Sequence, residues 1–312
     1  AGAAGEEDVA PVTLLGGKSF PVRIADSEGG EAFVTLEDIE RVKKLGEGFQ
    51  GEVWLSKDKQ TGILFAEKAQ KIVSDRIRDS IRREVQIMSE IVHPNLVLCY
   101  GELIDEQEKI MHYFLEFCDG GSLHGAIQKA KLSDEVVSVV MKHCLLGLKF
   151  LHDKNILHRD IKTENTLLSM TEKLIKMTDF GLSKKHQETT NTFIGTIEYM
   201  SPERLNGEPY TTYADLFSLG LVALECHLGK HPFDNRDKYW DYVGDGKGET
   251  LFEMYHDEGS SEELISFVNT CTYRTPEDRT SCAELLEHPL IKKYEDRHDA
   301  ILKEWFEQLS LE

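Results

Sequence analysis

The amino-acid sequence predicts an α+β protein, in which a small antiparallel β-sheet with one helix precedes a larger, mainly α-helical part. Short runs of alternating polar and apolar residues at 39–45, 51–57 and 63–69 are separated by glycine-bearing turns, which is typical of an antiparallel meander. Further on, residues 134–152 carry apolar side chains at helical spacing, and residues 213–228 are apolar on almost every side. The first pattern predicts a sheet, and the other two predict a helical core.

The composition excludes several classes of protein. The chain has 312 residues, 40% of them hydrophobic and 29% charged, so it is long enough for a substantial core. It contains no run of eighteen apolar residues, so the sequence predicts no membrane span. A net charge of −20 disfavours binding to nucleic acid or to an anionic membrane. The start lacks the basic and apolar regions of a signal peptide, and the six cysteines show no CxxC spacing, so we expect a cytoplasmic location. The composition leaves the oligomeric state open.

The first predicted turn contains the glycine-rich sequence GEGFQG at 46–51. A GxGxxG pattern is weak by itself, because a dinucleotide-binding turn requires a helix after the glycines. Strand-like alternation continues after Gly51, which favours a hairpin folded over phosphate groups, or a hairpin with no ligand.

A lysine and a glutamate in the following elements favour the phosphate-binding alternative. Lys68 lies on the third predicted strand, where an isolated lysine is usually a solvated edge charge. The predicted helix at about 75–91 has an apolar stripe, and Glu84 falls on that stripe. A carboxylate on the inward face of a helix needs a cationic partner, so we expect Glu84 to pair with Lys68.

Polar side chains cluster in two neighbouring segments of the helical part. Asp160 and Asn165 lie in the run HRDIKTEN at 158–165, and Asp179 begins the run DFG, each next to apolar residues. Carboxylate and amide oxygens suit Mg²⁺, which binds few protein ligands and completes its coordination with phosphate oxygens. A further carboxylate can orient or deprotonate a hydroxyl, and a lysine such as Lys162 can neutralise charge on a migrating phosphoryl group.

The two runs and their spacing resemble the catalytic and metal-binding loops of eukaryotic protein kinases. This resemblance implies a bilobal fold, with a small β-sheet N-lobe that carries one key helix and a larger, mainly α-helical C-lobe. It also implies ATP and Mg²⁺ as cofactors and a protein as substrate. The implied division of the chain is a flanking segment at 1–38, an N-lobe at 39–117, a C-lobe at 118–291 and a C-terminal extension helix at 292–312.

The resemblance implies a chemical role for each of these polar residues. Asp160 would accept or orient the hydroxyl, and Lys162 would steady the γ-phosphate. Asn165 and Asp179 would hold Mg²⁺, while Lys68 would bind the α- and β-phosphates. The residues implied to contact the nucleotide are Leu45, Gly46, Gly48, Gly51, Val53, Ala66, Lys68, Leu115 as gatekeeper, Glu116, Cys118, Ser122 and Leu167.

Further expectations concern the framework of the C-lobe. By resemblance, Asp215 in the buried helix would bind the backbone of the catalytic loop, and Arg279 would pair with Glu203. Ser133 is the predicted N-cap of the helix at 134–152. The remaining predicted elements are strands at 96–102 and 110–117, a surface loop at 234–250 and helices near 250–257, 261–271 and 281–287.

Among protein kinases, the chain is most similar to the MAP kinase kinases. Lys162 is typical of kinases that act on Ser or Thr, and the run NTFIGTIEYMSPERL at 191–205 has the Ser-Pro-Glu of that family. The extension at 292–312 is similar to the segment with which those kinases bind their upstream kinase. Its apolar stripe, which includes Trp305, could equally pack on the C-lobe of the chain itself.

By resemblance, the activation segment lies between Asp179 and Glu203. Arg159 implies control by phosphorylation, because kinases with an arginine before the catalytic aspartate commonly need an anion on this segment. Thr192 is the first candidate, since its neighbours best match the second phosphorylation site of the family, and Thr189 and Thr190 follow. Glu188 stands where many members have their first phosphorylated residue.

Three functions agree with these observations. The leading one is a MAP kinase kinase that phosphorylates a MAP kinase on Ser or Thr, with Tyr left open as a further acceptor. The second is a Ser/Thr kinase of a neighbouring family with another substrate. The third, a pseudokinase scaffold, is disfavoured because every residue with a chemical role is present. The family's basic docking peptide is not visible in residues 1–38, so the substrate is inferred from the resemblance.

Overall fold

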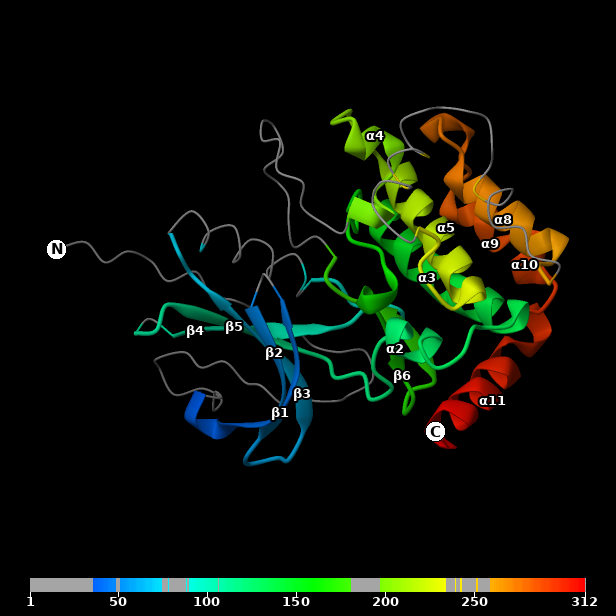
Figure 1. The fold of residues 1–312 in the computed structure, drawn as a ribbon. Helices are drawn as coiled ribbons and strands as arrows, with labels where there is room; N and C mark the ends of the chain where they lie inside the picture. The colour runs from blue at the N-terminus through cyan, green and yellow to red at the C-terminus, as the bar shows by residue number, and fades with distance from the viewer. Residues whose placement is uncertain are drawn as a thin grey trace. The chain divides into compact units, whose positions relative to one another are not determined.

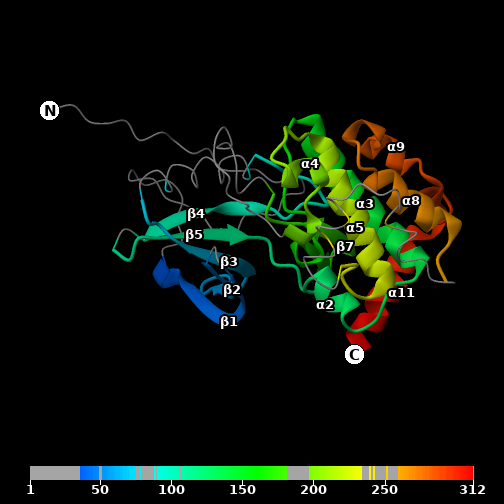
Figure 2. The same cartoon turned by 45° about the horizontal axis from the view of Figure 1, so that its top comes forward.

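The structure is a computed structural model, and its described part falls into two compact units. Figures 1 and 2 show a β-sheet in the first unit and mainly helices in the second, as predicted. Within the described residues, the first unit comprises 36–92 and 98–117, and the second comprises 93–97 and 118–311. The described residues are 36–48, 51–74, 78, 88, 90–105, 107–180, 197–233, 239, 242, 251 and 259–311.

The first unit contains a five-stranded antiparallel sheet with the strand order β1-β2-β3-β5-β4. Phe65 and Phe114 meet edge to face on one side of this sheet, with ring centroids 5.5 Å apart, and both are fully buried. The predicted meander is therefore confirmed, with boundaries that move by one to three residues. The strands are β1 (Ile39–Gly48), β2 (Gly51–Asp58), β3 (Leu64–Lys71), β4 (Cys99–Asp105) and β5 (Ile110–Leu115).

The same face of the sheet holds a buried carboxylate that sequence analysis did not identify. Glu67 on β3 is 1% exposed and accepts hydrogen bonds from Arg41 Nη2 at 2.6 Å and Ser56 Oγ at 2.7 Å. His112 Nδ1 lies 2.8 Å from the same carboxylate. Burial would raise the pKa of Glu67, but the hydrogen bonds from His112, Arg41 and Ser56 together outweigh burial and lower the pKa to about 2. One charged side chain thus links four strands.

The second unit is built around two long helices, α3 and α5, which pack against each other in its interior (Figures 1 and 2). Ser133 caps α3, because its side chain accepts a hydrogen bond from Val136 N, and this confirms the predicted N-cap. The elements are α2 (Leu123–Ile127), α3 (Asp134–Asp153), β6 (Thr166–Ser169), β7 (Leu174–Met177), α4 (Pro202–Leu205), α5 (Thr212–Leu228), α8 (Glu262–Thr272), α9 (Cys282–Leu286), α10 (Pro289–Lys292) and α11 (His298–Leu311).

Helix α5 is buried on every side from residue 214 to residue 227, as its sequence predicts. Gly220 permits the close approach of α8, since a Cβ at this position would lie 2.6 Å from the side chain of Cys271. No helix in the described ranges is both long enough and apolar enough to cross a membrane.

The structure differs from the predicted secondary structure at Tyr239. Tyr239 lies in the predicted surface loop at 234–250, yet its side chain is fully buried and its ring contacts that of Phe233 at 4.7 Å. The prediction of a surface loop is wrong at this residue, because an aromatic side chain next to an apolar neighbour gains more from burial than from exposure. Most of the helices predicted at 75–91 and 250–257 lies outside the described residues.

Helix α11 begins at a buried histidine that contacts α3. His298 Nε2 lies 3.0 Å from Ser138 Oγ, and this hydroxyl donates to the carbonyl oxygen of Leu290 at 2.8 Å. Ile301 and Trp305 are buried as well, and α11 packs against α3. The apolar stripe of the C-terminal extension therefore packs on the chain itself.

We expect the protein to lose stability as the pH falls from about 6.5 to 4. Burial, reinforced by the charge of Lys142, lowers the pKa of His298 to about 4. Within the described part of the chain, His298 Nδ1 has no hydrogen-bond partner, so protonation would add a buried unpaired donor. Because the pKa is lower in the folded state, the unfolded state binds the proton first. The contribution of His298 to the free energy of unfolding is therefore complete above pH 6.5 and is lost progressively down to pH 4.

Thermal unfolding of the parent and of His298→Gln across this pH range measures the effect. The unfolding midpoint of the variant should fall about 3–5 °C less than that of the parent, because glutamine can still donate to Ser138 but does not titrate. Part of the decline remains in the variant, since burial also lowers the pKa of His143 to about 4. Identical pH profiles would show that His298 does not contribute.

Candidate active site

A buried aspartate fastens the loop at 158–165 to helix α5. Asp215 is 2% exposed and accepts hydrogen bonds from the backbone nitrogens of His158 at 2.9 Å and Arg159 at 2.8 Å. Burial would raise the pKa of Asp215, but the hydrogen bond and charge of His152 help to lower it below its ordinary value. The carboxylate therefore stays charged, and its expected role toward the loop backbone is confirmed.

The carboxylate of Asp160 lies between a lysine and an amide. Asp160 Oδ2 accepts a hydrogen bond from Asn165 Nδ2 at 2.8 Å and forms an ion pair with Lys162 Nζ at 3.0 Å. Burial would raise the pKa of Asp160, but the charge and hydrogen bond of Lys162, together with Asn165, hold the pKa below its ordinary value. Asp160 is thus a carboxylate at neutral pH, and its side chain remains 26% exposed. It can accept a hydrogen bond or a proton from a hydroxyl.

The two predicted metal ligands lie on adjacent segments of the second unit. Both partners of Asn165 Nδ2 are oxygens of Asp160, so the amide nitrogen faces Asp160 and the amide oxygen is left as an acceptor. The carbonyl oxygen of Asn165 accepts from Thr178 N at 2.9 Å, which brings the neighbouring Asp179 beside it. Asp179 has a φ of 60°, and Phe180 after it is fully buried. One amide oxygen and one carboxylate form a donor set that fits Mg²⁺.

Four predicted nucleotide-contact residues share one face of the sheet in the first unit. Lys68 pairs directly with Val53 of β2, and Ala66 pairs with Leu115 of β5. Directly opposed residues, and residues two apart on one strand, point to the same face of a sheet. Lys68 is 6% exposed. Its expected partner Glu84 lies outside the described residues, so the ion pair stays a prediction.

The glycine-rich sequence forms a β-hairpin, which agrees with the predicted strand after Gly51. Gly46 pairs with Val53 and Gly48 pairs with Gly51, while residues 49–50 lie outside the described part. Gly51 has a φ of 129°, and a Cβ there would lie 2.0 Å from the carbonyl oxygen of Ala69. Only glycine fits this position. Leu45, just before the hairpin glycines, is 44% exposed.

The segment after β5 brings two further predicted residues together in the second unit. An isolated bridge joins Ser122 to Leu167 of β6, and the Ser122 side chain caps α2 by accepting from Gly125 N. Gly120 makes this approach possible, since a Cβ there would lie 2.8 Å from Leu168. Cys118, two residues before Gly120, is 5% exposed. Glu116 belongs to the first unit and is 8% exposed, and its side chain accepts a hydrogen bond from Leu98 N at 3.2 Å.

A buried ion pair confirms the expected link between Glu203 and Arg279. The guanidinium donates two parallel hydrogen bonds to the carboxylate, at 2.8 and 2.9 Å, and both side chains are at most 3% exposed. Such two-point pairing fixes orientation as well as distance. The guanidinium also lies 5.0 Å from the ring of Phe217 and donates to the carbonyl oxygens of Tyr213, Tyr273 and Arg274.

The segment at 181–196, with the predicted phosphorylation sites Thr189, Thr190 and Thr192, lies outside the described residues. Arg204, which follows this segment in helix α4, donates from Nη1 to the carbonyl oxygen of Arg159 at 2.9 Å. Both guanidinium groups lie within 6 Å of the Tyr210 ring.

The sequence motifs point to Arg159 but not to Arg204 or Tyr210. Their contact depends on the path of the chain between the catalytic loop and α4, and no local pattern in the sequence indicates that path.

Comparison with known proteins agrees with this geometry. The family described as "Protein kinase domain" matches residues 39–291, and its members use ATP. The chain is 37% identical to "Mitogen-activated protein kinase kinase 2" of Arabidopsis thaliana over 88% of this chain and 77% of that protein. It is 36% identical to "Mitogen-activated protein kinase kinase SIPKK" of Nicotiana tabacum over 84% of this chain and 75% of that protein. It is also 33% identical to the "Aurora kinase" of Schizosaccharomyces pombe, over 81% of this chain and 71% of that protein.

These matches confirm the predicted fold class, which is the bilobal protein kinase fold with a β-sheet lobe and a helical lobe. They also confirm the predicted similarity to the MAP kinase kinases. The chain belongs to the protein kinase family and is an enzyme of that family.

Proposed function

We propose that the chain is a MAP kinase kinase that transfers the γ-phosphate of Mg·ATP to Ser or Thr hydroxyls of a MAP kinase. The observation that best supports phosphoryl transfer is the position of the Asp160 carboxylate, which is held between Lys162 Nζ and Asn165 Nδ2. The identity of 36–37% to relatives named as MAP kinase kinases supports the finer assignment.

In the proposed reaction, the residues of the catalytic loop orient and neutralise the reacting groups. Asp160 accepts a hydrogen bond from the substrate hydroxyl and takes its proton as the phosphoryl group transfers. Lys162 places a positive charge beside the migrating group. Mg²⁺, held by Asn165 and Asp179, would neutralise charge on the phosphate oxygens.

The nucleotide contacts stay part of this proposal. Lys68 would bind the α- and β-phosphates, and the placement of Val53, Ala66 and Leu115 on the same face as Lys68 supports this assignment. A cytoplasmic location is proposed as well, and the six cysteines, which are all free and buried, agree with it.

The test is incubation of the protein with Mg·ATP and a panel of MAP kinases, with a generic basic protein alongside. We expect labelling of a MAP kinase on its activation segment, with Asp160→Asn as the inactive control. Labelling of the generic protein alone would favour a Ser/Thr kinase of a neighbouring family, which the similarity to Aurora kinase also favours. No transfer to any protein would support a pseudokinase scaffold.

We expect activity to depend on phosphorylation of the activation segment. A phosphate on Thr192, or on Thr189 or Thr190, carries about −1.5 to −2 charges and can order the segment by pairing with an arginine. Arg159 is the expected partner, and Arg204 places a second cation beside it. Phosphorylation by an upstream kinase should therefore raise activity at least about tenfold.

The measurement is mass-spectrometric mapping of the activated protein, together with the activity of a variant in which all three threonines are alanine. Thr270→Ala, on the exposed side of α8, is a matched control that should respond like the parent. If the triple variant is activated as fully as the parent, control lies elsewhere in the chain.

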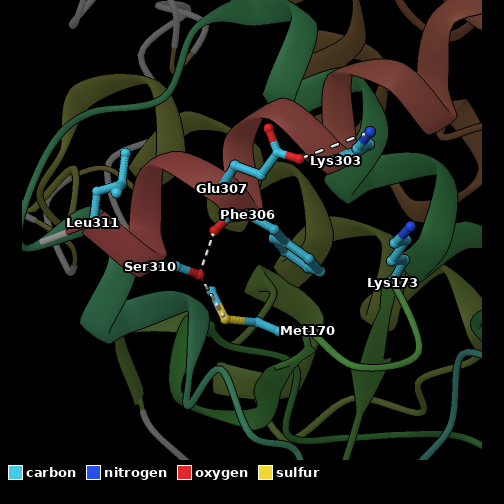
Figure 3. A pocket seen from close by; sticks show the side chains of 7 residues that line it. All are labelled: Met170, Lys173, Lys303, Phe306, Glu307, Ser310 and Leu311. Atoms are coloured by element: carbon cyan, nitrogen blue, oxygen red, sulfur yellow. Dashed lines mark hydrogen bonds and ion pairs between the residues drawn. The ribbon is translucent and has the colours of Figure 1, made fainter.

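The proposed partners include an upstream kinase that binds residues 292–312. The buried stripe of α11 contacts α3, so a partner would bind at the part of the helix that this contact leaves open. A groove of about 540 Å³ lies along α11, between this helix and the turn after β6, and Figure 3 shows the residues that line it. Met170, Phe306 and Leu311 supply its apolar lining, and Lys173 and Lys303 lie at its edge.

A further inference from the structure

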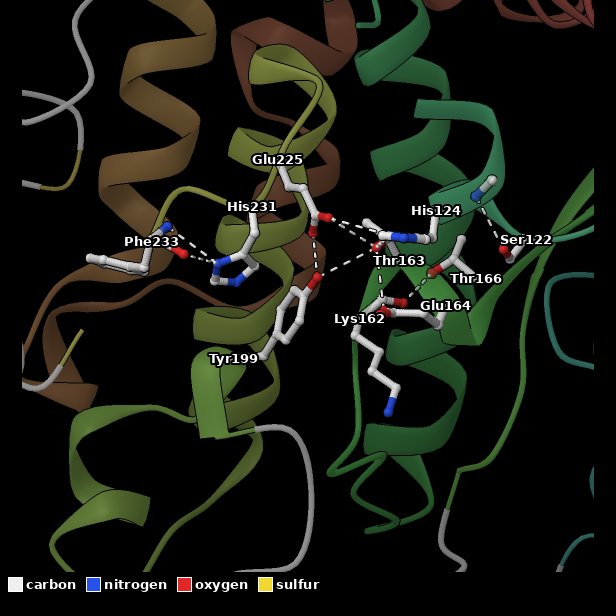
Figure 4. A network of polar contacts seen from close by, with 11 residues as sticks. Ser122, His124, Lys162, Thr163, Glu164, Thr166, Tyr199, Glu225, His231 and Phe233 are labelled. Atoms are coloured by element: carbon white, nitrogen blue, oxygen red, sulfur yellow. Dashed lines mark hydrogen bonds and ion pairs between the residues drawn. The ribbon is translucent and has the colours of Figure 1, made fainter. Parts of the chain in front are cut away.

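A cluster of buried polar side chains joins the catalytic loop to helix α5 (Figure 4). Thr163 Oγ1 donates to Glu225 Oε1 at 3.2 Å, and the hydroxyl of Tyr199 donates to Glu225 Oε2. Thr163 is fully buried, Glu225 is 1% exposed and Tyr199 is 6% exposed. His124 Nδ1 approaches the cluster from α2, 3.4 Å from Thr163 Oγ1 and 3.7 Å from Glu225 Oε1.

Each carboxylate oxygen of Glu225 has a hydroxyl within hydrogen-bond distance. Burial raises the pKa of the Tyr199 phenol, and the charge of Glu225 raises it further, so the phenol keeps its proton and donates. The acceptor that lies nearest to Thr163 Oγ1 is Glu225 Oε1 at 3.2 Å, while Glu164 Oε2, His124 Nδ1 and the Tyr199 hydroxyl each lie at 3.4 Å. Removal of the Thr163 hydroxyl would take from Glu225 Oε1 its nearest donor, and a buried carboxylate oxygen that loses a donor is destabilised.

The same helix therefore holds the catalytic loop at two points. Asp215 binds the backbone of His158 and Arg159, and Glu225 binds the side chain of Thr163. The two carboxylates are ten residues apart on α5, which corresponds to about 15 Å along the helix axis. Since α5 is buried on all sides, it is a rigid support for both contacts. Between the two contacts lie the residues proposed to act on the substrate.

The contact of Thr163 acts on Lys162 through a short segment of backbone. Thr163 begins a single 3-10 turn that ends at Asn165, whose backbone nitrogen donates to the carbonyl oxygen of Lys162 at 3.1 Å. Lys162 and Asn165 are the two residues that hold the carboxylate of Asp160. A change in the position of Thr163 therefore changes the surroundings of Asp160 on both sides.

We propose that Thr163 is a positioning residue for phosphoryl transfer, and that it acts by fastening the second half of the catalytic loop to Glu225. This inference rests on phosphoryl transfer by Asp160, and it does not depend on which protein is the substrate. Thr163 does not touch the reacting groups. It sets the distances of Lys162 and Asn165 from Asp160 by holding the turn between them.

The test compares Thr163→Val with the parent, using Mg·ATP and whichever protein of the panel the parent labels, the generic basic protein included. Valine keeps the shape of threonine and removes the hydroxyl. We expect kcat to fall about 10- to 100-fold, since misplacement of a catalytic group by about 1 Å can cost a hundredfold. The KM for ATP should change less than about threefold, and Thr163→Ser, which restores the hydroxyl, should recover most of kcat.

Two controls separate positioning from a general loss of stability. Thr272→Val removes another buried hydroxyl, one that donates to Val268 O within its own helix α8. It should lower the unfolding midpoint by a similar amount and leave kcat within twofold of the parent. Thr163→Val combined with Glu225→Gln should cost less than the product of the two single losses, because the two residues share one hydrogen bond.

Parental kcat in Thr163→Val would overturn the inference, as would an equal loss of kcat in Thr272→Val. A failure of Thr163→Ser to recover activity would also contradict it. These outcomes differ from a failure of the proposed function. A parent that labels the generic protein but no MAP kinase would refute the MAP kinase kinase assignment and leave the comparison of Thr163 variants intact.

Discussion

Replacement of Asp160 by asparagine should lower kcat at least about a thousandfold while the affinity for ATP stays within about threefold of the parent. Asp160 contacts the substrate hydroxyl in the proposed reaction, so its contribution appears in the transition state and not in nucleotide binding. Asparagine has the same shape but cannot take a proton. Lys162 and Asn165 both contact the same oxygen, Oδ2, so the amide oxygen of asparagine can accept from both donors and the loop geometry should be kept.

Single-turnover phosphoryl transfer and a separate measurement of ATP binding distinguish the two effects. Asp153→Asn is a suitable control, because Asp153 pairs with Lys149 on the surface of α3, and the change should leave both quantities unchanged. Comparable turnover in Asp160→Asn would show that another group activates the hydroxyl. A large loss of ATP affinity would place Asp160 in nucleotide binding.

Replacement of Arg279 by methionine should lower the free energy of unfolding by about 3–5 kcal/mol, the usual cost of breaking a buried ion pair from one side. The carboxylate of Glu203 would stay buried without its partner. Three carbonyl oxygens would lose a donor at the same time. Since whole proteins are stable by only about 5–15 kcal/mol, this loss should be visible as partial unfolding under mild conditions.

Urea unfolding of matched variants tests this expectation. Arg297→Met removes an arginine that is 60% exposed and pairs with Glu135 at 3.6 Å, so it should change the free energy of unfolding by less than about 1 kcal/mol. The double variant Glu203→Gln with Arg279→Met should recover part of the stability, because no lone charge stays buried. Equal losses for Arg279→Met and Arg297→Met would contradict the role of the buried pair.

The sequence by itself determined most elements of the described part and identified the residues proposed for catalysis. Alternating and helical patterns predicted β1 to β3, α3 and α5, because the side of an element that faces the core is a local property of the chain. Asp160, Lys162 and Asn165 were found because they lie within six residues of one another. Asp215 and the Arg279–Glu203 pair were found by resemblance, and the structure places their partners where they were expected.

Only the tertiary structure decided how buried polar side chains are paired. Glu67 is satisfied by side chains from β1, β2 and β5, and its neighbours in sequence do not reveal these partners. Glu225 binds Thr163 and Tyr199, which lie 62 and 26 residues away along the chain. A local pattern can show that a residue is buried, but a buried charge or hydroxyl must find its partner wherever the fold brings one. Strand register and helix packing determine that partner, and both are set by contacts between distant parts of the chain.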